Sequence, residues 1–139
     1  MEYKFDKVLF SQQSDFQLIQ IVETKDFGRL LILNEMANLA ENDKVEYTHT
    51  MMNIPHESYK GKEVLILGGG DGGLLKELLE LPEGPAFITM VEIDEMVMDA
   101  CAEFMPSVCG DYLKQENWDG PNYKVVNGCA IQFMKDCQV

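Results

Sequence analysis

A loop of glycines around one aspartate is the part of the sequence best suited to chemistry. The segment "GGGDGG" (residues 68–73) follows four apolar residues and precedes a leucine-rich stretch. Glycines permit a tight turn and let a ligand approach the backbone closely. An acid, Glu92, follows Gly70 by 22 residues, about the spacing at which a carboxylate binds ribose hydroxyls in nucleotide-binding βαβ units. The loop and the acid together predict a nucleoside site.

Asp71, which lies between the glycines, limits what this nucleoside can carry. A pyrophosphate would be repelled by a carboxylate in its own binding loop. We therefore expect a ligand that is neutral or cationic near the loop, and an adenosine bearing a sulfonium, or an amine, meets that condition. A second interpretation stays open, in which Asp71 caps the helix that follows and contributes about 1 kcal/mol. One side chain could have both roles.

The elements that would position these residues alternate between strand and helix after Lys60. Strands are predicted at 64–67, 87–93 and 123–127, and each is followed by a segment with helical apolar spacing. The second of these helices has Asp94 as its N-cap, and the third starts near Ala130. This pattern predicts an α/β fold with a parallel sheet and right-handed crossovers. Because such a sheet usually has more strands, we expect the chain to be the N-terminal part of a larger domain.

The first 40 residues are typical of β structure instead. Two apolar runs in "FQLIQIVETKDFGRLLILN" are joined by the turn Asp26-Phe27-Gly28, which predicts a hairpin. Residues 41–53 have helical spacing, with Asn42 or Asp43 as the cap and Pro55 as the end. We therefore expect an N-terminal β-hairpin region (1–40) and a partial Rossmann-like nucleoside-binding domain (41–139).

Composition narrows the partners and the compartment. The chain has 24 acidic and 11 basic residues and a formal net charge of −13, which argues against nucleic acid and anionic membranes as partners. No apolar run approaches the roughly 18 residues of a membrane span, and the first ten residues do not form a signal peptide. The four cysteines have neither a C-x-x-C pair nor zinc spacing. We expect a cytoplasmic protein with free thiols and no metal.

Several motifs together resemble one family. "VLILGGGDGGLL" with "VEID" after it, "SDFQ" at 14–17, "FGRLLIL" and "ENDKVEYTHTMM" resemble the polyamine aminopropyltransferases, which are the spermidine and spermine synthases. The resemblance covers nearly the whole chain and is greater to spermine synthases, because "NLAEND" and Tyr47-Thr48 depart from the spermidine synthase pattern. It implies a Rossmann-like, methyltransferase-type doubly wound sheet. It also implies transfer of an aminopropyl group from decarboxylated S-adenosylmethionine to spermidine, with release of methylthioadenosine and without a metal.

The resemblance also implies roles for individual residues. The nucleoside would be bound by residues of the loop, of the first motif and of two strand ends: Gln17, Gly68, Gly70, Glu92, Cys129 and Ala130. Tyr47 and Asp71 would hold the amine acceptor, with Asp71 near the reacting centre as the catalytic residue that this chain contains. Simpler structural explanations stay open, with Tyr47 packing on the sheet, Gln17 as a polar edge-strand residue and Glu92 as a loop acid. Asp94 is expected to be a cap rather than a ligand.

The sequence departs from the family in two ways. Cys129 occupies the position of an acid that contacts adenine, and a thiol is a poor acceptor for an amino group. The family's general-base aspartate would lie beyond Val139. We therefore expect little activity from this chain alone. For the full-length protein we expect a homodimer. Two alternatives are an S-adenosylmethionine-dependent methyltransferase, which shares the strand, loop and acid, and an inactive truncated subunit that pairs with a complete one.

Overall fold

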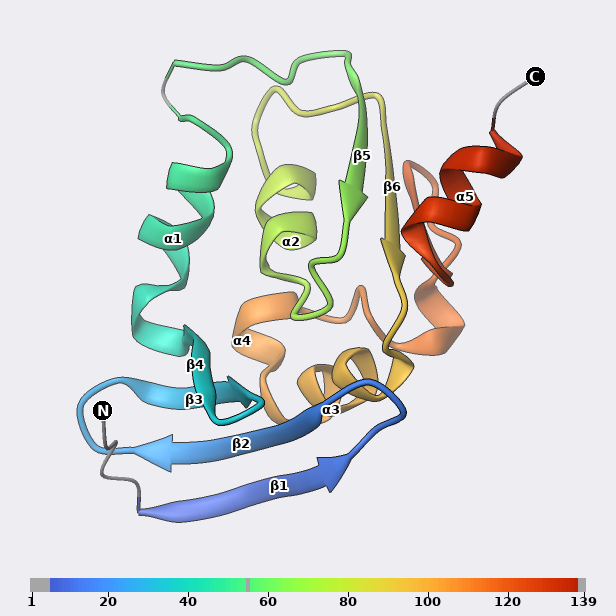
Figure 1. Ribbon diagram of the computed structural model, residues 1–139. Coiled ribbons are helices and arrows are strands. Elements are labelled where there is room, and N and C mark those ends of the chain that lie inside the picture. The colour runs from blue at the N-terminus through green and yellow to red at the C-terminus, as the bar shows by residue number, and fades with distance from the viewer. Residues whose placement is uncertain (1–5, 55, 138–139) are drawn as a thin grey trace.

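The chain forms an antiparallel sheet followed by a smaller parallel sheet with helices around it (Figure 1). A computed structural model describes residues 6–54 and 56–137. The antiparallel sheet has four strands in sequence order, β1 (Lys7–Gln13), β2 (Leu18–Thr24), β3 (Gly28–Leu33) and β4 (Met36–Ala40). The parallel sheet has the order β5 (Glu63–Leu67), β6 (Phe87–Glu92) and β7 (Tyr123–Asn127). The expected α/β class, with a hairpin region ahead of a Rossmann-like half-sheet, is confirmed.

The predicted hairpin is the centre of the antiparallel sheet. β2 and β3 pair in regular register around the turn at Asp26-Phe27, and Gly28 has the positive φ of +75° that this turn requires. The two outer strands extend the hairpin beyond what the apolar pattern indicated. β4 follows a turn in which Asn34 and Glu35 have φ of 50° and 66°. The predicted helix at 41–53 is a 3₁₀ turn (Glu41–Asp43) followed by α1 (Lys44–Met51).

The caps of α1 and α3 can be compared with their predictions. Asp43 occupies the N-cap position of α1 but its side chain makes no capping hydrogen bond. The predicted end at Pro55 lies outside the described residues. Asp94 does cap α3 (Glu95–Phe104), because its Oδ1 accepts a hydrogen bond of 3.2 Å from the backbone N–H of Met96.

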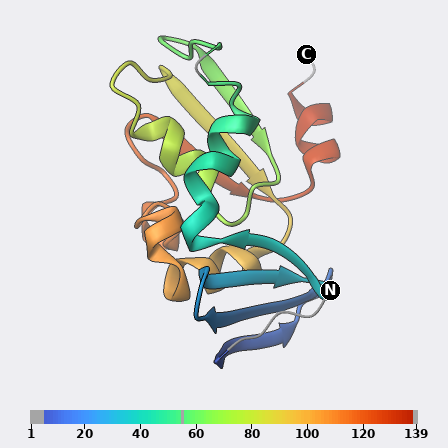
Figure 2. The same cartoon turned by 90° about the vertical axis from the view of Figure 1, so that its left-hand side faces the viewer.

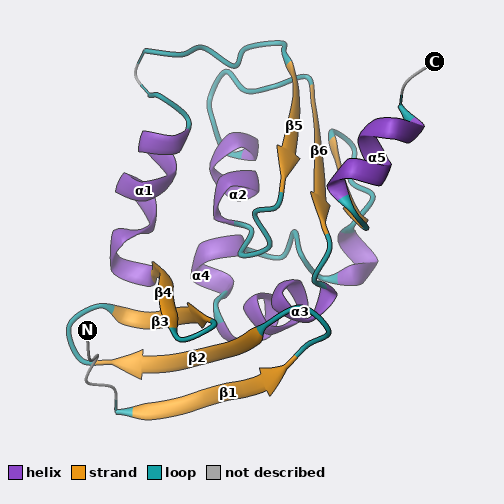
Figure 3. Cartoon of the chain, in the orientation of Figure 1, coloured by secondary structure: helices purple, strands orange, loops and turns teal. Residues whose placement is uncertain are grey.

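Helices cover the parallel sheet unequally. In Figure 3, α1 and α2 (Gly73–Leu79) lie on one side of β5 and β6, and α5 (Ala130–Asp136) lies on the other. The start of α5 at Ala130 agrees with the sequence prediction. Two short elements were not expected, α4 (Pro106–Cys109) and a 3₁₀ turn (Gln115–Asn117). α4 packs against α2 and α3.

One hydrophobic core joins the two sheets. Ile19, Ile21 and Leu31 of the antiparallel sheet belong to the same buried cluster as Ile66 and Met90 of the parallel sheet. Figure 2 shows the antiparallel strands below the parallel sheet, next to α3. Polar contacts hold this arrangement as well, since Arg29 Nη1 donates a hydrogen bond of 2.6 Å to the Phe104 carbonyl. Among the described residues, no helix is long and apolar enough to cross a membrane.

Candidate active site

The glycine loop fits closely against the end of β6. The Gly68 N–H donates to the Val91 carbonyl at 2.8 Å, which fixes the loop to the neighbouring strand. A Cβ atom on Gly70 would lie 2.6 Å from Oε1 and 2.9 Å from Cδ of Glu92. Position 70 therefore accepts a side chain only if the Glu92 carboxylate moves. The Glu92 carboxylate is itself held from the other side, because its Oε2 accepts from the Asp94 N–H at 3.0 Å.

Asp71 lies one residue before Gly72, which is the N-cap of α2, and its side chain both contacts the start of that helix and lines a cavity. Its Oδ1 accepts a hydrogen bond of 2.7 Å from the Gly73 N–H, at the first residue of α2. Among the described residues, Oδ2 has no hydrogen-bond partner, so this oxygen remains available to the cavity that Asp71 lines. Burial raises the pKa of the Asp71 carboxyl, and the hydrogen bond from Gly73 opposes that shift. The site therefore favours a positive charge beside Asp71.

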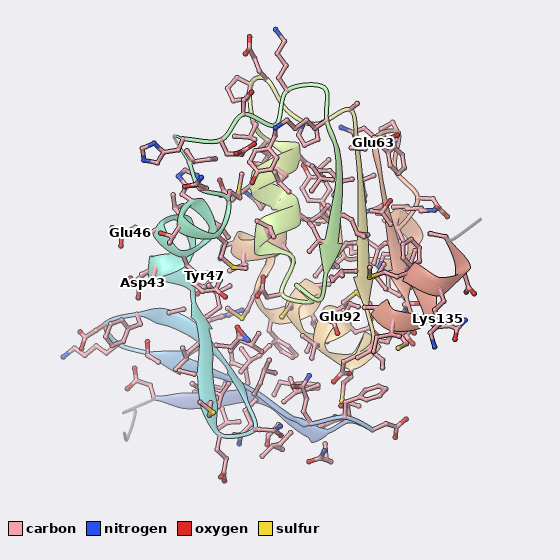
Figure 4. The ribbon with its side chains drawn as sticks, turned by 45° about the horizontal axis from the view of Figure 1, so that its top comes forward. Asp43, Glu46, Tyr47, Glu63, Glu92 and Lys135 are labelled. Carbon is pink, nitrogen blue, oxygen red and sulfur yellow. The ribbon has the colours of Figure 1, made fainter. Side chains whose placement is uncertain are left out.

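A cavity of about 310 Å³ collects most of the predicted site residues. Its lining includes Gln17 from the turn before β2, Tyr47 from α1, Gly70 and Asp71 from the loop, and Glu92 from the end of β6. Figure 4 labels Tyr47 on α1 and Glu92 on the end of β6, with the loop after β5 between them. Tyr47 is 46% exposed, so it is not a residue packed on the sheet. The lining of this cavity comes from both sheets.

Three of the predicted nucleoside-binding residues do not line this cavity, namely Gly68, Cys129 and Ala130. Gly68 acts through the backbone hydrogen bond to β6. Cys129 is exposed and occupies the N-cap of α5 without a capping hydrogen bond. The segment before it still adjoins Glu92, because the Gly128 N–H donates to the Glu92 carbonyl at 3.0 Å.

Two polar residues in or beside the cavity were not singled out as ligand-contacting or positioning residues. Asn38 of β4 lines the cavity, and the only sequence signal for it is a polar residue within the apolar stretch that ends at Ala40. Asp94 was expected to be a cap alone. Its side chain is only 1% exposed, and its Oδ2 also accepts from Ser14 Oγ at 2.7 Å and from Gln17 Nε2 at 3.0 Å. Asp94 therefore ties the β1–β2 turn to α3.

The lining of the cavity is acidic and otherwise neutral. Asp71 and Glu92 are its charged residues, and within the described part of the chain no lysine, arginine or histidine lines it. No group of three or more metal-ligating side chains occurs among the described residues either. A cavity with two carboxylates and no cation suits a hydroxyl-bearing ligand or a cationic ligand and disfavours a phosphate or a free carboxylate.

Comparison with known proteins places this arrangement in a family. Residues 44–139 match the family described as the spermine/spermidine synthase domain, and residues 1–41 match the spermidine synthase tetramerisation domain. The chain belongs to the spermine/spermidine synthase family. It is 31% identical over 137 residues to a polyamine aminopropyltransferase of Alkaliphilus metalliredigens and 33% identical over 133 residues to a spermine synthase of Arabidopsis thaliana.

Solved structures agree with the sequence relatives. A crystal structure of spermidine synthase in complex with the transition-state analogue AdoDATO superimposes with a TM-score of 0.81 and 27% identity over 96% of this chain. A spermidine synthase from Thermotoga maritima gives a TM-score of 0.80. The chain spans less than half the length of these relatives. It covers 46% of the Alkaliphilus protein and 35% of the Arabidopsis protein. Proteins named spermidine synthase and spermine synthase both match, so similarity does not distinguish between these two activities.

Proposed function

We propose that this chain supplies the nucleoside-binding and amine-binding part of a polyamine aminopropyltransferase. The observation that carries the proposal is a single cavity of about 310 Å³ that the Asp71 and Glu92 side chains both line, with the Glu92 carboxylate against Gly70. Glu92 would accept hydrogen bonds from the two ribose hydroxyls of decarboxylated S-adenosylmethionine. Asp71, with Tyr47 beside it, would hold the amine acceptor next to the sulfonium group.

The reaction that this arrangement would support is a displacement at carbon. The acceptor amine uses its lone pair to form a bond to the aminopropyl carbon next to sulfur, and the carbon–sulfur bond breaks with its electron pair going to sulfur. The products are methylthioadenosine and an alkylated ammonium that loses one proton. Alignment of the two reactants accounts for much of such a rate enhancement. Asp71 and Tyr47 contribute by fixing the amine, and Gln17 and Glu92 contribute by fixing the nucleoside.

The proposal also concerns the general base, which is the group that removes a proton from the acceptor amine. Among the described residues the cavity has two carboxylates, and both have binding roles in the scheme above. Neither is then left to remove the amine proton, so we expect the 139-residue chain to bind both ligands and to turn over very slowly. Turnover comparable with that of a complete relative, measured as methylthioadenosine release, would contradict this expectation.

The proposed acceptor is spermidine rather than putrescine. A second cavity of about 270 Å³ shares Asn38 and Tyr47 with the first and is otherwise lined mainly by apolar residues, with Asp43 among them. Apolar walls suit the methylenes of a longer acceptor and the Asp43 carboxylate suits its far ammonium group. Calorimetric titration with each polyamine tests this, and tighter binding of putrescine than of spermidine would count against it.

A methyltransferase that uses ordinary S-adenosylmethionine is the second candidate function. That ligand carries an additional carboxylate, which would enter a cavity that has two acids and, within the described residues, no cationic side chain. The lining therefore supports decarboxylated S-adenosylmethionine. Titration calorimetry of both nucleosides with the 139-residue chain separates the two functions, since tighter binding of ordinary S-adenosylmethionine would favour the methyltransferase.

Assembly is also part of the proposal. Residues 1–41 match a region described as a tetramerisation domain, so we propose that chains associate through the antiparallel sheet. Val8 and Met36 of this sheet are 45% and 74% exposed in the single chain. The expected homodimer, and pairing of this chain with a complete subunit, remain predictions. Sedimentation analysis of the wild-type chain and of Met36→Lys tests whether this face takes part, and a wild-type chain that stays monomeric would contradict the proposal.

A further inference from the structure

We propose that Asp94 is a positioning residue that fixes the side-chain amide of Gln17 with its carbonyl oxygen toward the nucleoside cavity. This inference rests on the proposed function and adds a determinant of ligand charge to it. Gln17 lines the cavity, whereas Asp94 lies behind it and is not part of the lining. Asp94 would therefore influence the ligand only through Gln17.

The direction of the hydrogen bonds determines how the Gln17 amide lies. The carboxylate of Asp94 has only acceptors to offer, so the Gln17 group that meets its Oδ2 at 3.0 Å is the NH₂ group. The planar amide then directs Oε1 away from Asp94. Among the described residues no donor is paired with Oε1, which leaves this oxygen as the polar atom that Gln17 offers to the cavity.

The surroundings of this pair leave Gln17 little freedom. Ser14 Oγ donates to the same Asp94 oxygen at 2.7 Å and accepts from the backbone N–H groups of Phe16 and Gln17, each at 3.1 Å. The other Asp94 oxygen accepts from the Met96 N–H at the start of α3. Three donors around a side chain that is 1% exposed form a satisfied buried network, which holds one arrangement more firmly than separate surface contacts do.

A fixed carbonyl oxygen in the cavity would distinguish the substrate from the product. The proposed substrate carries a positive sulfonium, and the product methylthioadenosine carries a neutral thioether on the same nucleoside. The negative end of the Gln17 dipole stabilises a nearby positive charge in a partly dry cavity, and it has little effect on the thioether. Asp94 would thus favour the sulfonium nucleoside without contacting it.

The variant Asp94→Asn tests this inference with little change of shape. Asparagine also caps helices well, so α3 keeps an acceptor for the Met96 N–H. Its NH₂ group then faces the NH₂ group of Gln17, and the Gln17 amide must turn over and direct its NH₂ toward the ligand. We expect Kd for decarboxylated S-adenosylmethionine to rise about tenfold and Kd for methylthioadenosine to change less than about threefold. Equal losses for the two nucleosides would overturn the positioning role.

A reciprocal substitution provides the control for misfolding. When Gln17→Glu is added to Asp94→Asn, the NH₂ group at position 94 can donate to the carboxylate at position 17. The second carboxylate oxygen at position 17 then faces the cavity. We expect this double variant to recover the preference for the sulfonium nucleoside. If the double variant folds and still lacks that preference, the inference is wrong.

A measurement without ligand separates this inference from the proposed function. In the nuclear magnetic resonance spectrum of the wild-type chain, the Gln17 side-chain NH₂ protons should exchange with water more slowly than those of the exposed Gln12. Asp94→Asn should abolish this protection. Protected Gln17 protons in a chain that binds neither nucleoside would contradict the proposed function while the Asp94–Gln17 pairing stands. Unprotected protons in the wild-type chain would overturn the pairing itself.

Discussion

The substitution Gly70→Ala should damage nucleoside binding far more than it damages the fold. Gly70 has no positive φ, so alanine introduces no backbone strain there. Its Cβ would lie 2.6 Å from Glu92 Oε1, and the atom that must move is the end of a side chain. Moving it gives up the hydrogen bond from the Asp94 N–H, which costs about 1 kcal/mol of stability. If Glu92 then loses one charge-assisted hydrogen bond to ribose, worth about 1.5–3 kcal/mol, Kd for methylthioadenosine rises roughly 10- to 150-fold.

Gly68→Ala is the matched control in the same loop. Gly68 has a φ of +86°, and a Cβ added at this position would meet nothing within 4 Å, so alanine there strains the backbone but displaces nothing. We expect a loss of about 1–2 kcal/mol in the free energy of unfolding, with nucleoside affinity nearly unchanged. Titration calorimetry and urea unfolding of both variants measure the two effects. Wild-type affinity in Gly70→Ala, or an equal loss of affinity in Gly68→Ala, would refute the reasoning.

Three further predictions concern charge, packing and thiol reactivity. Burial raises the pKa of Asp71 above its ordinary 3.8, so the folded chain binds that proton more tightly than the unfolded chain does, and stability falls as pH rises from 3.8 through the raised pKa. Asp71→Asn should therefore raise the free energy of unfolding at about pH 7 and weaken this pH dependence. Urea unfolding at several pH values measures both effects. Gly72→Ala combines a φ of +77° with a Cβ 2.5 Å from Cys109 Cβ, so it should cost roughly 2–5 kcal/mol in thermal unfolding experiments, more than Gly68→Ala. Burial raises the pKa of the Cys109 thiol to about 12, and burial also raises the pKa of the Cys101 thiol. A thiol reagent at about pH 8 should therefore modify the exposed Cys129 and Cys137 quickly, and it should modify the two buried thiols only when the chain unfolds.

The elements predicted from sequence were those with a strong local signal. The hairpin had a glycine at the position where its turn needs a positive φ, and α3 had a capping aspartate before an apolar stripe. The strand β4 lacked such a signal. Its preceding turn has Asn34 and Glu35 at positive φ, where glycine would have been the recognisable residue. The helix α4 spans only Pro106–Cys109, too short for periodicity to reveal it.

The candidate site was predictable where one residue type suits one chemistry. Asp71 and Glu92 stood out because a carboxylate in a glycine loop and another at a strand end restrict the ligand. The link between Gln17 and Asp94 could not be predicted, since it joins residues 77 positions apart and depends on how the two sheets pack. Cys129 shows the converse limit, because its alignment with a nucleoside-binding position did not bring its side chain into the cavity.

The packing of the two sheets is therefore what creates the site. The turn before β2 supplies Gln17 and β4 supplies Asn38, while the glycine loop and β6 supply Asp71 and Glu92, so the cavity needs both halves of the fold. The shared core holds the sheets together through apolar contacts, which determine distance but not side-chain orientation. Orientation comes from directional contacts across the junction, among them the hydrogen bonds from Ser14 and from the cavity-lining Gln17 to the buried Asp94 carboxylate. A chain that kept the core but lost those bonds would retain its fold and bind its nucleoside less selectively.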